Sequence, residues 1–196
     1  MNGQRILQVS ARTLDRVFKA ISEAGLRSER LIPEYYEFIP LNTHRITEEL
    51  SFVVDKCFTA PNCSKRFLDV GCGPGNVMLI AETFGFTPFG IEYNPSLVRR
   101  APYRQLKQYF PTGTEGGIYQ QDAFKFPHYG DFDVVYLYCP VADHSLEVNL
   151  ENIIESRLKK GAIYIANLKQ DQSIKKKLDF EFLGAEKELP IWRKIK

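Results

Sequence analysis

The sequence predicts an α/β protein, a doubly wound seven-strand sheet whose last strand is antiparallel, with helices on both faces and an N-terminal helical extension. Short apolar runs alternate with amphipathic helical patterns after Lys65, which is typical of a parallel sheet covered on both faces. A glycine-rich loop follows the first of these runs. The last two runs are separated by too few residues for a helical crossover, so an antiparallel strand is expected there.

Composition supports a compact protein with a sizeable core. The chain has 196 residues, of which 44% are hydrophobic and 26% charged. The net charge of +2 gives no argument for a nucleic-acid or membrane partner, and no segment is long and apolar enough to span a membrane. The four cysteines form neither a CxxC pair nor a zinc-ligand pattern with histidine, so we expect no metal, no disulfides and a cytoplasmic location.

Residues 1–64 are expected to form the helical extension. Residues 11–25 place apolar side chains at helical spacing, and a second amphipathic helix over 45–58 has Thr43 as its expected N-cap. The segment between them is rich in aromatic residues and is interrupted by Pro33 and Pro40. We therefore expect an irregular connection there.

Residues 65–196 form the expected sheet domain. The apolar runs predict strands over 66–70, 87–93, 117–121, 131–138, 161–167, 180–184 and 190–196. The helical patterns predict helices over 76–85, 95–110 and 145–158, the second of them kinked or split by Pro102.

The segment FLDVGCGPGN, residues 67–76, places three glycines directly after the first strand of this sheet. Gly71, Gly73 and Gly75 together exceed what a tight turn needs, and glycine costs backbone entropy. In a doubly wound sheet the ligand lies beyond the carboxyl ends of the strands. The loop is therefore predicted to bring bare backbone against a ligand.

Acidic residues at strand ends make the expected ligand more specific. Glu92 ends the second strand, 21 residues after Gly71, where a carboxylate can accept hydrogen bonds from both hydroxyls of a ribose. Asp122 follows the third strand and can accept from an adenine amino group, and Asp69 suits a cationic group. Pro74 lacks an N–H, which argues against a pyrophosphate on this loop. The ligand is thus expected to be a nucleoside with little anionic charge.

Each of these residues also has an ordinary structural interpretation. Asp69 can brace the loop, Glu92 can be a solvated acid at a strand end, and Asp122 can be a turn residue. Cys72 is expected to fill space in the loop, because no neighbour in sequence would lower its pKa and make it a nucleophile.

The segments DVGCGPGN, GIEYNP, QQDAF and DVVYLYCP, in this order, resemble the successive motifs of class I S-adenosylmethionine-dependent methyltransferases. The resemblance covers residues 65–196 and implies a Rossmann-like methyltransferase domain with S-adenosylmethionine as cofactor. It implies that Glu92 holds the ribose hydroxyls and that Tyr93 flanks the adenine, whose edge Asp122 and Ala123 bind. The residues that it implies around the methionine moiety and the ribose are Asp69, Gly71, Cys72, Gly73 and Gly75.

The acceptor side is expected around YLYCPVADH, after the fourth strand. The Asn/Asp-Pro-Pro-aromatic motif of many enzymes that methylate base amines is missing there, which argues against an exocyclic base amine as acceptor. Tyr136 and Tyr138 share one face of the strand by alternation. Tyr138 and Asp143 are the candidate catalytic residues; equally, Tyr138 can pack under a helix, and Asp143 with His144 can cap the next one.

A narrower resemblance joins FIPLNTHRITEEL and GIEYNPSLVRR to seven-strand protein-lysine methyltransferases of the ATP synthase c-subunit type. It implies that Pro40 and Thr43 lie in a segment that closes over the cofactor, with Thr43 in contact with it. We predict a gate formed by residues 35–44 over the methionine end. The alternative is that the aromatic residues of this segment only pack the first helices onto the sheet.

Other acceptors stay open. A small-molecule methyltransferase and an inactive cofactor-binding module are two alternatives. An RNA methyltransferase would need a basic surface, and the sequence has two groups of basic residues. Such groups are more typical of solvated helix faces, so no strong basic patch for nucleic acid is expected. The basic residues are Arg99, Arg100, Arg104 and Lys107, and Lys175, Lys176 and Lys177.

Overall fold

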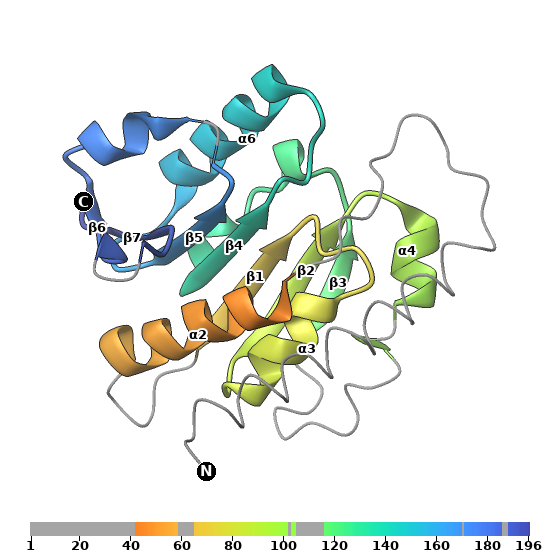
Figure 1. Cartoon of the computed structure of the whole chain (residues 1–196). Helices are drawn as coiled ribbons and strands as arrows, with labels where there is room; N and C mark the ends of the chain where they lie inside the picture. The colour runs from red at the N-terminus through yellow and green to blue at the C-terminus, as the bar shows by residue number, and fades with distance from the viewer. Residues whose placement is uncertain (1–41, 59–64, 102, 105–115, 170, 186–187) are drawn as a thin grey trace, which may run out of the picture.

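The computed structural model describes residues 42–58, 65–101, 103–104, 116–169, 171–185 and 188–196 (Figure 1). The predicted first helix lies outside these ranges. So do residues 35–41 of the predicted gate, whereas residues 43 and 44 form the beginning of a helix.

A seven-stranded sheet forms the centre of the molecule (Figure 1), and its order is β3-β2-β1-β4-β5-β7-β6. β1 to β5 pair in parallel, while β7 runs antiparallel to both β5 and β6. This confirms the predicted doubly wound sheet with its last strand reversed. The strands are β1 Arg66–Val70, β2 Thr87–Glu92, β3 Gly117–Gln120, β4 Val134–Tyr138, β5 Ile163–Asn167, β6 Phe180–Phe182 and β7 Ile191–Lys194.

Helices cover both faces of the sheet, as predicted (Figure 1). α2 (Thr43–Cys57) and α3 (Asn76–Thr83) pack on one face, where the buried cluster includes Phe67 and Tyr136. α6 (His144–Arg157) packs on the other, with Leu68 and Val135. Successive strand residues thus alternate between two cores, which is why these strands read as continuous apolar runs.

The start of α2 corrects one prediction. Its N-cap is Asn42, whose side chain accepts a hydrogen bond from the backbone N–H of Arg45 at 3.1 Å, and Thr43 is the first helical residue. Asparagine and threonine both make good caps, but only Asn42 has the extended backbone (φ −76°, ψ 100°) that a cap requires. Thr43 is buried, with 2% of its surface exposed.

The first part of the helix predicted over 95–110 ends before Pro102. α4 spans Pro95–Arg100, and Ala101 ends it directly before the proline, as the restriction on residues preceding proline requires. Three short 3-10 helices lie in connections for which no element was expected: η2 Ala123–Lys125, η3 Tyr129–Asp131 and η4 Gln172–Lys176.

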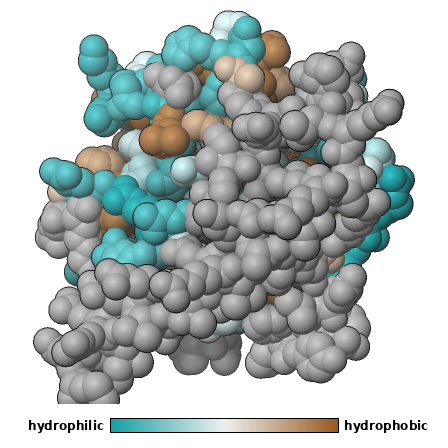
Figure 2. Space-filling view, turned by 45° about the vertical axis from the view of Figure 1, so that its right-hand side comes forward, coloured by the Kyte–Doolittle hydropathy of each residue, from teal (hydrophilic) through white to brown (hydrophobic). Residues whose placement is uncertain are grey.

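The surface carries no sign of a membrane segment in the described part. None of the helices there has the length and apolar character needed to cross a bilayer. On the face shown in Figure 2 the described residues are mostly hydrophilic, with hydrophobic residues in small scattered groups.

Candidate functional site

Hydrogen bonds from its own N–H groups, most of them to the end of β2, hold the loop that leaves β1. The N–H groups of Gly71 and Cys72 both donate to the carbonyl of Ile91 at 2.9 Å, and the N–H of Gly75 donates to the carbonyl of Cys72 at 2.9 Å. The N–H of Gly73 donates to the Glu92 carboxylate at 2.9 Å, and Pro74 has no N–H. Residues 71–75 therefore donate all their N–H groups within the protein, unlike a loop that cradles a pyrophosphate.

The three loop glycines share a backbone conformation that favours glycine. All have positive φ, at 76°, 52° and 84° for Gly71, Gly73 and Gly75. A Cβ on Gly71 would lie 2.5 Å from Pro140 Cβ, and one on Gly75 would lie 2.6 Å from Tyr103 Cβ. Protein atoms thus occupy the space beside two of the glycines.

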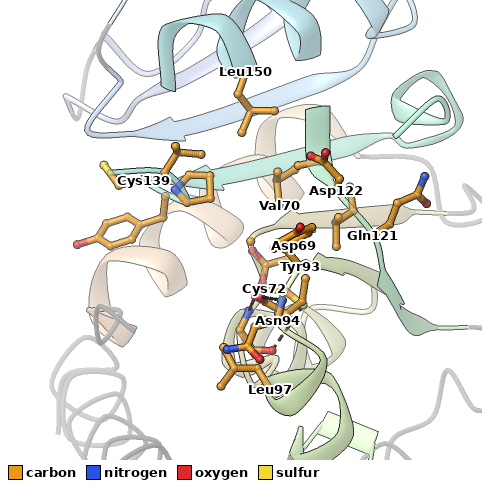
Figure 3. Close-up of a pocket in the computed structure, with 18 of the residues that line it drawn as sticks. Asp69, Val70, Cys72, Tyr93, Asn94, Leu97, Gln121, Asp122, Cys139 and Leu150 are labelled. Carbon is orange, nitrogen blue, oxygen red and sulfur yellow. Dashed lines mark hydrogen bonds between the residues drawn. The ribbon is translucent and has the colours of Figure 1, made fainter. Parts of the chain in front are cut away.

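A cavity of about 890 Å³ lies beyond the carboxyl ends of β1, β2 and β4 (Figure 3). In this view Asp122 and Cys139 lie on opposite sides of it, with Asp69 between them. Four carboxylates line the cavity, and the described residues that line it include no lysine, arginine or histidine. The lining acids are Asp69, Glu92, Asp122 and Asp143. Such a cavity attracts cations and repels phosphates.

Asp69 is the most buried of these acids. Its side-chain oxygen Oδ2 has no hydrogen-bond partner among the described residues, and only 3% of the residue is exposed. Burial, and then the charge of Glu92, raise the pKa of Asp69 well above its usual range. A carboxylate that is desolvated in this way and lacks a donor is suited to a cationic ligand group.

Glu92 is fixed by backbone donors. One carboxylate oxygen accepts from Gly73 N at 2.9 Å and the other from Asn94 N at 2.7 Å. Burial raises the pKa of Glu92, and the bonds from Asn94 and Gly73 oppose that shift. Each oxygen keeps a second lone pair, so the carboxylate can brace the loop and still accept from two hydroxyls.

Asp122 and its neighbours form the side of the cavity opposite Cys139 (Figure 3). Asp122 Oδ1 caps η2 by accepting from Phe124 N at 3.0 Å, and Lys125 Nζ lies 3.4 Å from Oδ2. Ala123 and Tyr93 line the cavity too, and Tyr93 is 60% exposed. The turn interpretation and the ligand interpretation of Asp122 are thus compatible.

The segment after β4 lines the acceptor side. Cys139 has φ 41°, a left-handed conformation that costs a non-glycine residue about 1 kcal/mol, and it follows half-buried Tyr138. Asp143 caps α6, accepting from Ser145 N and Leu146 N. Hydrogen bonds, first of all from the Ser145 hydroxyl, hold the pKa of this exposed carboxyl below its usual range. Asp143 is therefore ionised and a weak base.

Buried glutamates of α6 contact the segment that follows β4 and the side chain of Lys169. Glu147 accepts from Val141 N at 3.2 Å, while Glu151 and Glu155 flank the ammonium of Lys169 at 2.6 and 2.8 Å. Burial, then the charge of Glu151, raise the pKa of Glu147 to about 7.

Glu147→Gln is expected to flatten the pH dependence of stability. Because the folded pKa of Glu147 lies above its unfolded value, its stabilising contribution is complete below about pH 4.5 and is lost as pH rises through about 7. Between pH 5 and 8 the free energy of unfolding of the wild type should fall by up to about 3 kcal/mol more than that of the variant, since one pKa unit corresponds to about 1.4 kcal/mol. Urea unfolding at both pH values measures this.

Glutamine keeps an oxygen for Val141 N, so the fold should persist in that variant. Burial first of all also raises the pKa of Glu49 to about 7. The Glu147→Gln variant should therefore keep the part of the pH dependence of stability that Glu49 causes. Glu48→Gln, at an exposed position of α2, is the control and should keep the pH dependence of the wild type. An equal slope in Glu147→Gln and the wild type would contradict the prediction.

The structure brings most of the predicted site residues together. Ten of them line the cavity: Asp69, Gly71, Cys72, Gly73, Glu92, Tyr93, Asp122, Ala123, Tyr138 and Asp143. Gly75 and Thr43 are not among the lining residues. Gly75 caps α3 instead, and Thr43 lies in the first turn of α2. Cys72 is buried, and burial raises the pKa of its thiol well above the usual range, in agreement with a space-filling role.

Several lining residues were not predicted. Asn94, Leu97, Gln121, Leu146 and Leu150 all line the cavity. Asn94 and Gln121 lie within the segments GIEYNP and QQDAF, two residues and one residue from the acids Glu92 and Asp122 that were chosen there, so considering every polar residue of these segments would have found them. Leu146 and Leu150 are four residues apart on α6, and helical spacing alone does not distinguish them from core residues.

Comparison with known proteins identifies the class of domain. A family model described as "Methyltransferase domain" matches residues 61–191. No curated protein matches the chain.

Among solved structures, the chain is similar to the CcbJ methyltransferase from Streptomyces caelestis, at 15% identity and a TM-score of 0.49, over 62% of this chain and 47% of that one. It is similar to an RNA methyltransferase from Salinibacter ruber in complex with S-adenosyl-L-homocysteine, at 24% identity and a TM-score of 0.48, over 62% of this chain and 72% of that one. It is also similar to CalS10, an amino pentose methyltransferase from Micromonospora echinaspora, at 21% identity and a TM-score of 0.48, over 76% of this chain and 55% of that one. The chain thus spans about half the length of the first of these proteins.

Proposed function

Because the chain belongs to the class I S-adenosylmethionine-dependent methyltransferases, we propose that it methylates the side-chain amine of a protein lysine. The observation that carries the choice of acceptor is the charge of the cavity, whose described lining has four carboxylates and no cationic side chain. Such a cavity favours a cationic nucleoside and an acceptor that arrives as a cation, and it disfavours phosphates and negatively charged acceptors.

The residues present fit the cofactor. Asp69 offers an ammonium a buried carboxylate oxygen that has no partner among the described residues, and the loop 71–75 keeps no N–H for a pyrophosphate. In this proposal Glu92 accepts from the ribose hydroxyls, Asp122 and Ala123 bind the adenine edge, and Tyr93 lies against the ring. S-adenosylmethionine supplies, when bound, a methyl group on a positively charged sulfur.

The acceptor amine must be neutral to receive a methyl group, and lysine is normally protonated at neutral pH. In this proposal exposed, ionised Asp143 attracts the lysine ammonium to the cavity. Val141, Leu146 and Leu150 then surround its aliphatic stem and disfavour its charge, so that the proton passes to solvent at the exposed end. Burial raises the pKa of Tyr138, which keeps its proton, so its hydroxyl orients the amine and does not act as a base.

The isolated protein is expected to bind S-adenosylmethionine and S-adenosylhomocysteine and to bind NAD at least about 100-fold more weakly. The pyrophosphate of NAD would meet a loop whose N–H groups are all used within the protein and a cavity lined by carboxylates. Isothermal titration calorimetry with the three ligands, under one buffer and salt condition, measures the ratio. NAD binding as tight as S-adenosylmethionine binding would refute the assignment of the cofactor site.

The acceptor is tested with methyl-tritiated S-adenosylmethionine. Total protein and total RNA from one cell lysate are incubated separately with the enzyme, and acid hydrolysis of the protein identifies the labelled amino acid. Label in methylated lysine is the expected result, and the Gly73→Val variant is the blank. Label confined to RNA would reject lysine as the acceptor and leave the cofactor assignment in place.

A further inference from the structure

Polar side chains gather on one face of the sheet where β1, β4 and β5 end. Asp69 of β1 and Tyr136 of β4 are direct neighbours in the strand register, and both line the cavity. Asn167 ends β5 beside Tyr138, and Tyr136 and Tyr138 belong to the core beneath α2 and α3. Adjacent strands lie about 5 Å apart, so Asp69 and Tyr136 lie side by side on this face.

A chain of buried hydrogen bonds connects this face to α2. Arg45 Nε donates to Glu49 Oε1 at 2.9 Å, and Asn167 Nδ2 donates to Glu49 Oε2 at 3.0 Å and to the Tyr136 hydroxyl oxygen at 3.4 Å. The exposed fractions of Glu49, Tyr136 and Asn167 are 0%, 1% and 7%. Because Glu49 and Asn167 are 118 residues apart, only the folded protein brings them together.

The direction of these bonds leaves one proton unused. The Asn167 amide donates to Tyr136, so the phenol oxygen is the acceptor in that bond and its own O–H can donate elsewhere. The described residues provide no acceptor for it. Asp69 Oδ2 has no hydrogen-bond partner among the described residues either. Burial raises the pKa of Tyr136 well above its usual range, which keeps the hydroxyl protonated.

A buried hydroxyl donor beside a buried carboxylate complements the two charged ends of an amino acid. We propose that Tyr136, oriented by Asn167 and Glu49, donates a hydrogen bond to the carboxylate of the cofactor's methionine moiety, beside Asp69, which receives its ammonium. This rests on the proposed function, since it requires the nucleoside to lie in the cavity. It makes α2, through Glu49, a positioning element for cofactor recognition.

Tyr136→Phe tests the hydrogen bond while it keeps the ring that packs in the core. Two ligands are titrated by calorimetry: S-adenosylhomocysteine, and 5′-methylthioadenosine, which keeps the nucleoside and the sulfur but lacks the amino-acid end. We expect the variant to bind S-adenosylhomocysteine about 10- to 100-fold more weakly and 5′-methylthioadenosine as well as the wild type, because a hydrogen bond to a charged group is lost only with the first ligand. Equal weakening of both ligands, or of neither, would overturn the inference.

Controls separate this result from a failure of the proposed function and from misfolding. A wild type that does not bind S-adenosylhomocysteine would reject the proposed function itself. Tyr164→Phe is the matched control, because Tyr164 is buried on β5, its hydroxyl has no partner among the described residues, and it belongs to the core on the other face. It should bind both ligands like the wild type.

The positioning role of Glu49 is tested by a double-mutant cycle. Glu49→Ala should weaken S-adenosylhomocysteine binding selectively, and Glu49→Gln, which keeps an oxygen for Asn167, should restore most of it. If Glu49 acts through Tyr136, the double variant Glu49→Ala/Tyr136→Phe should bind no more weakly than Tyr136→Phe alone. Fully additive losses would show that Glu49 does not act through Tyr136.

Discussion

Gly73→Val is expected to abolish measurable binding of S-adenosylmethionine while the protein remains folded. Gly73 lines the cavity at φ 52°, and its N–H donates to the Glu92 carboxylate. A branched side chain disfavours this backbone conformation and projects from the loop at the place where the nucleoside is proposed to lie. Rotation of the backbone would also remove a donor from Glu92. We expect a loss of more than about 100-fold in affinity.

Gly161→Val is the matched control for backbone strain. Gly161 also has positive φ, 87°, and a Cβ there would have no atom within 4 Å. Both variants should lose about 1–2 kcal/mol in the free energy of unfolding, since both force a side chain into the left-handed region. Only Gly73→Val should lose binding in calorimetry. Wild-type affinity in a folded Gly73→Val protein would mean that this loop does not contact the cofactor.

The sheet was predictable because its central strands, β1, β4 and β5, are buried on both faces and therefore appear in the sequence as short apolar runs. The acids of the cavity were predictable for a related reason. Parallel strands end at one edge, so residues at the ends of different strands, such as Asp69 and Asp122, meet there. The pattern of the sequence thus predicted that these acids line one site.

The sequence revealed less about why particular residues stand at their positions. Gly71 and Gly75 were expected to make room for a ligand, yet Pro140 and Tyr103 occupy the space beside them. Those neighbours come from distant parts of the chain, so local spacing contains no information about them. The cap of α2 was assigned to Thr43 and belongs to Asn42, because two adjacent cap-forming residues differ only in a backbone conformation that the sequence does not display.

Polar contacts between distant elements could not be predicted at all. The bond from Asn167 to Glu49 depends on the strand order and on how α2 lies on the sheet. Glu147 is one of several glutamates of α6, and its burial against Val141 N appears only in the fold. Both glutamates are buried in spite of their charge, which is rare for glutamate, so the sequence alone gives no reason to expect it.

Asp69→Asn is expected to weaken binding of S-adenosylhomocysteine by about 10- to 100-fold and to leave the protein at least as stable as the wild type. The loss of affinity follows from replacing a charged partner of the ligand ammonium by a neutral amide of the same shape. Stability should not fall, because the carboxylate oxygen Oδ2 of Asp69 has no donor among the described residues, and a buried charge without a partner is costly. Any gain should be larger at high pH. A carboxyl whose folded pKa is raised loses its stabilising contribution as pH increases, whereas the amide does not titrate.

The same carboxyl gives the wild type a pH-dependent affinity that the variant should lack. Burial and the charge of Glu92 raise the pKa of Asp69 in the unliganded protein, whereas a bound ammonium would lower it again. Binding should therefore release a proton at pH values between these two pKa values, and affinity should increase with pH until Asp69 is ionised before the ligand arrives. Calorimetry in two buffers of different ionisation enthalpy counts the released protons directly. Because Glu92 also has a raised pKa, the decisive quantity is the difference between the two proteins. If Asp69→Asn binds S-adenosylhomocysteine like the wild type, or releases as many protons, then Asp69 is not the partner of the ammonium.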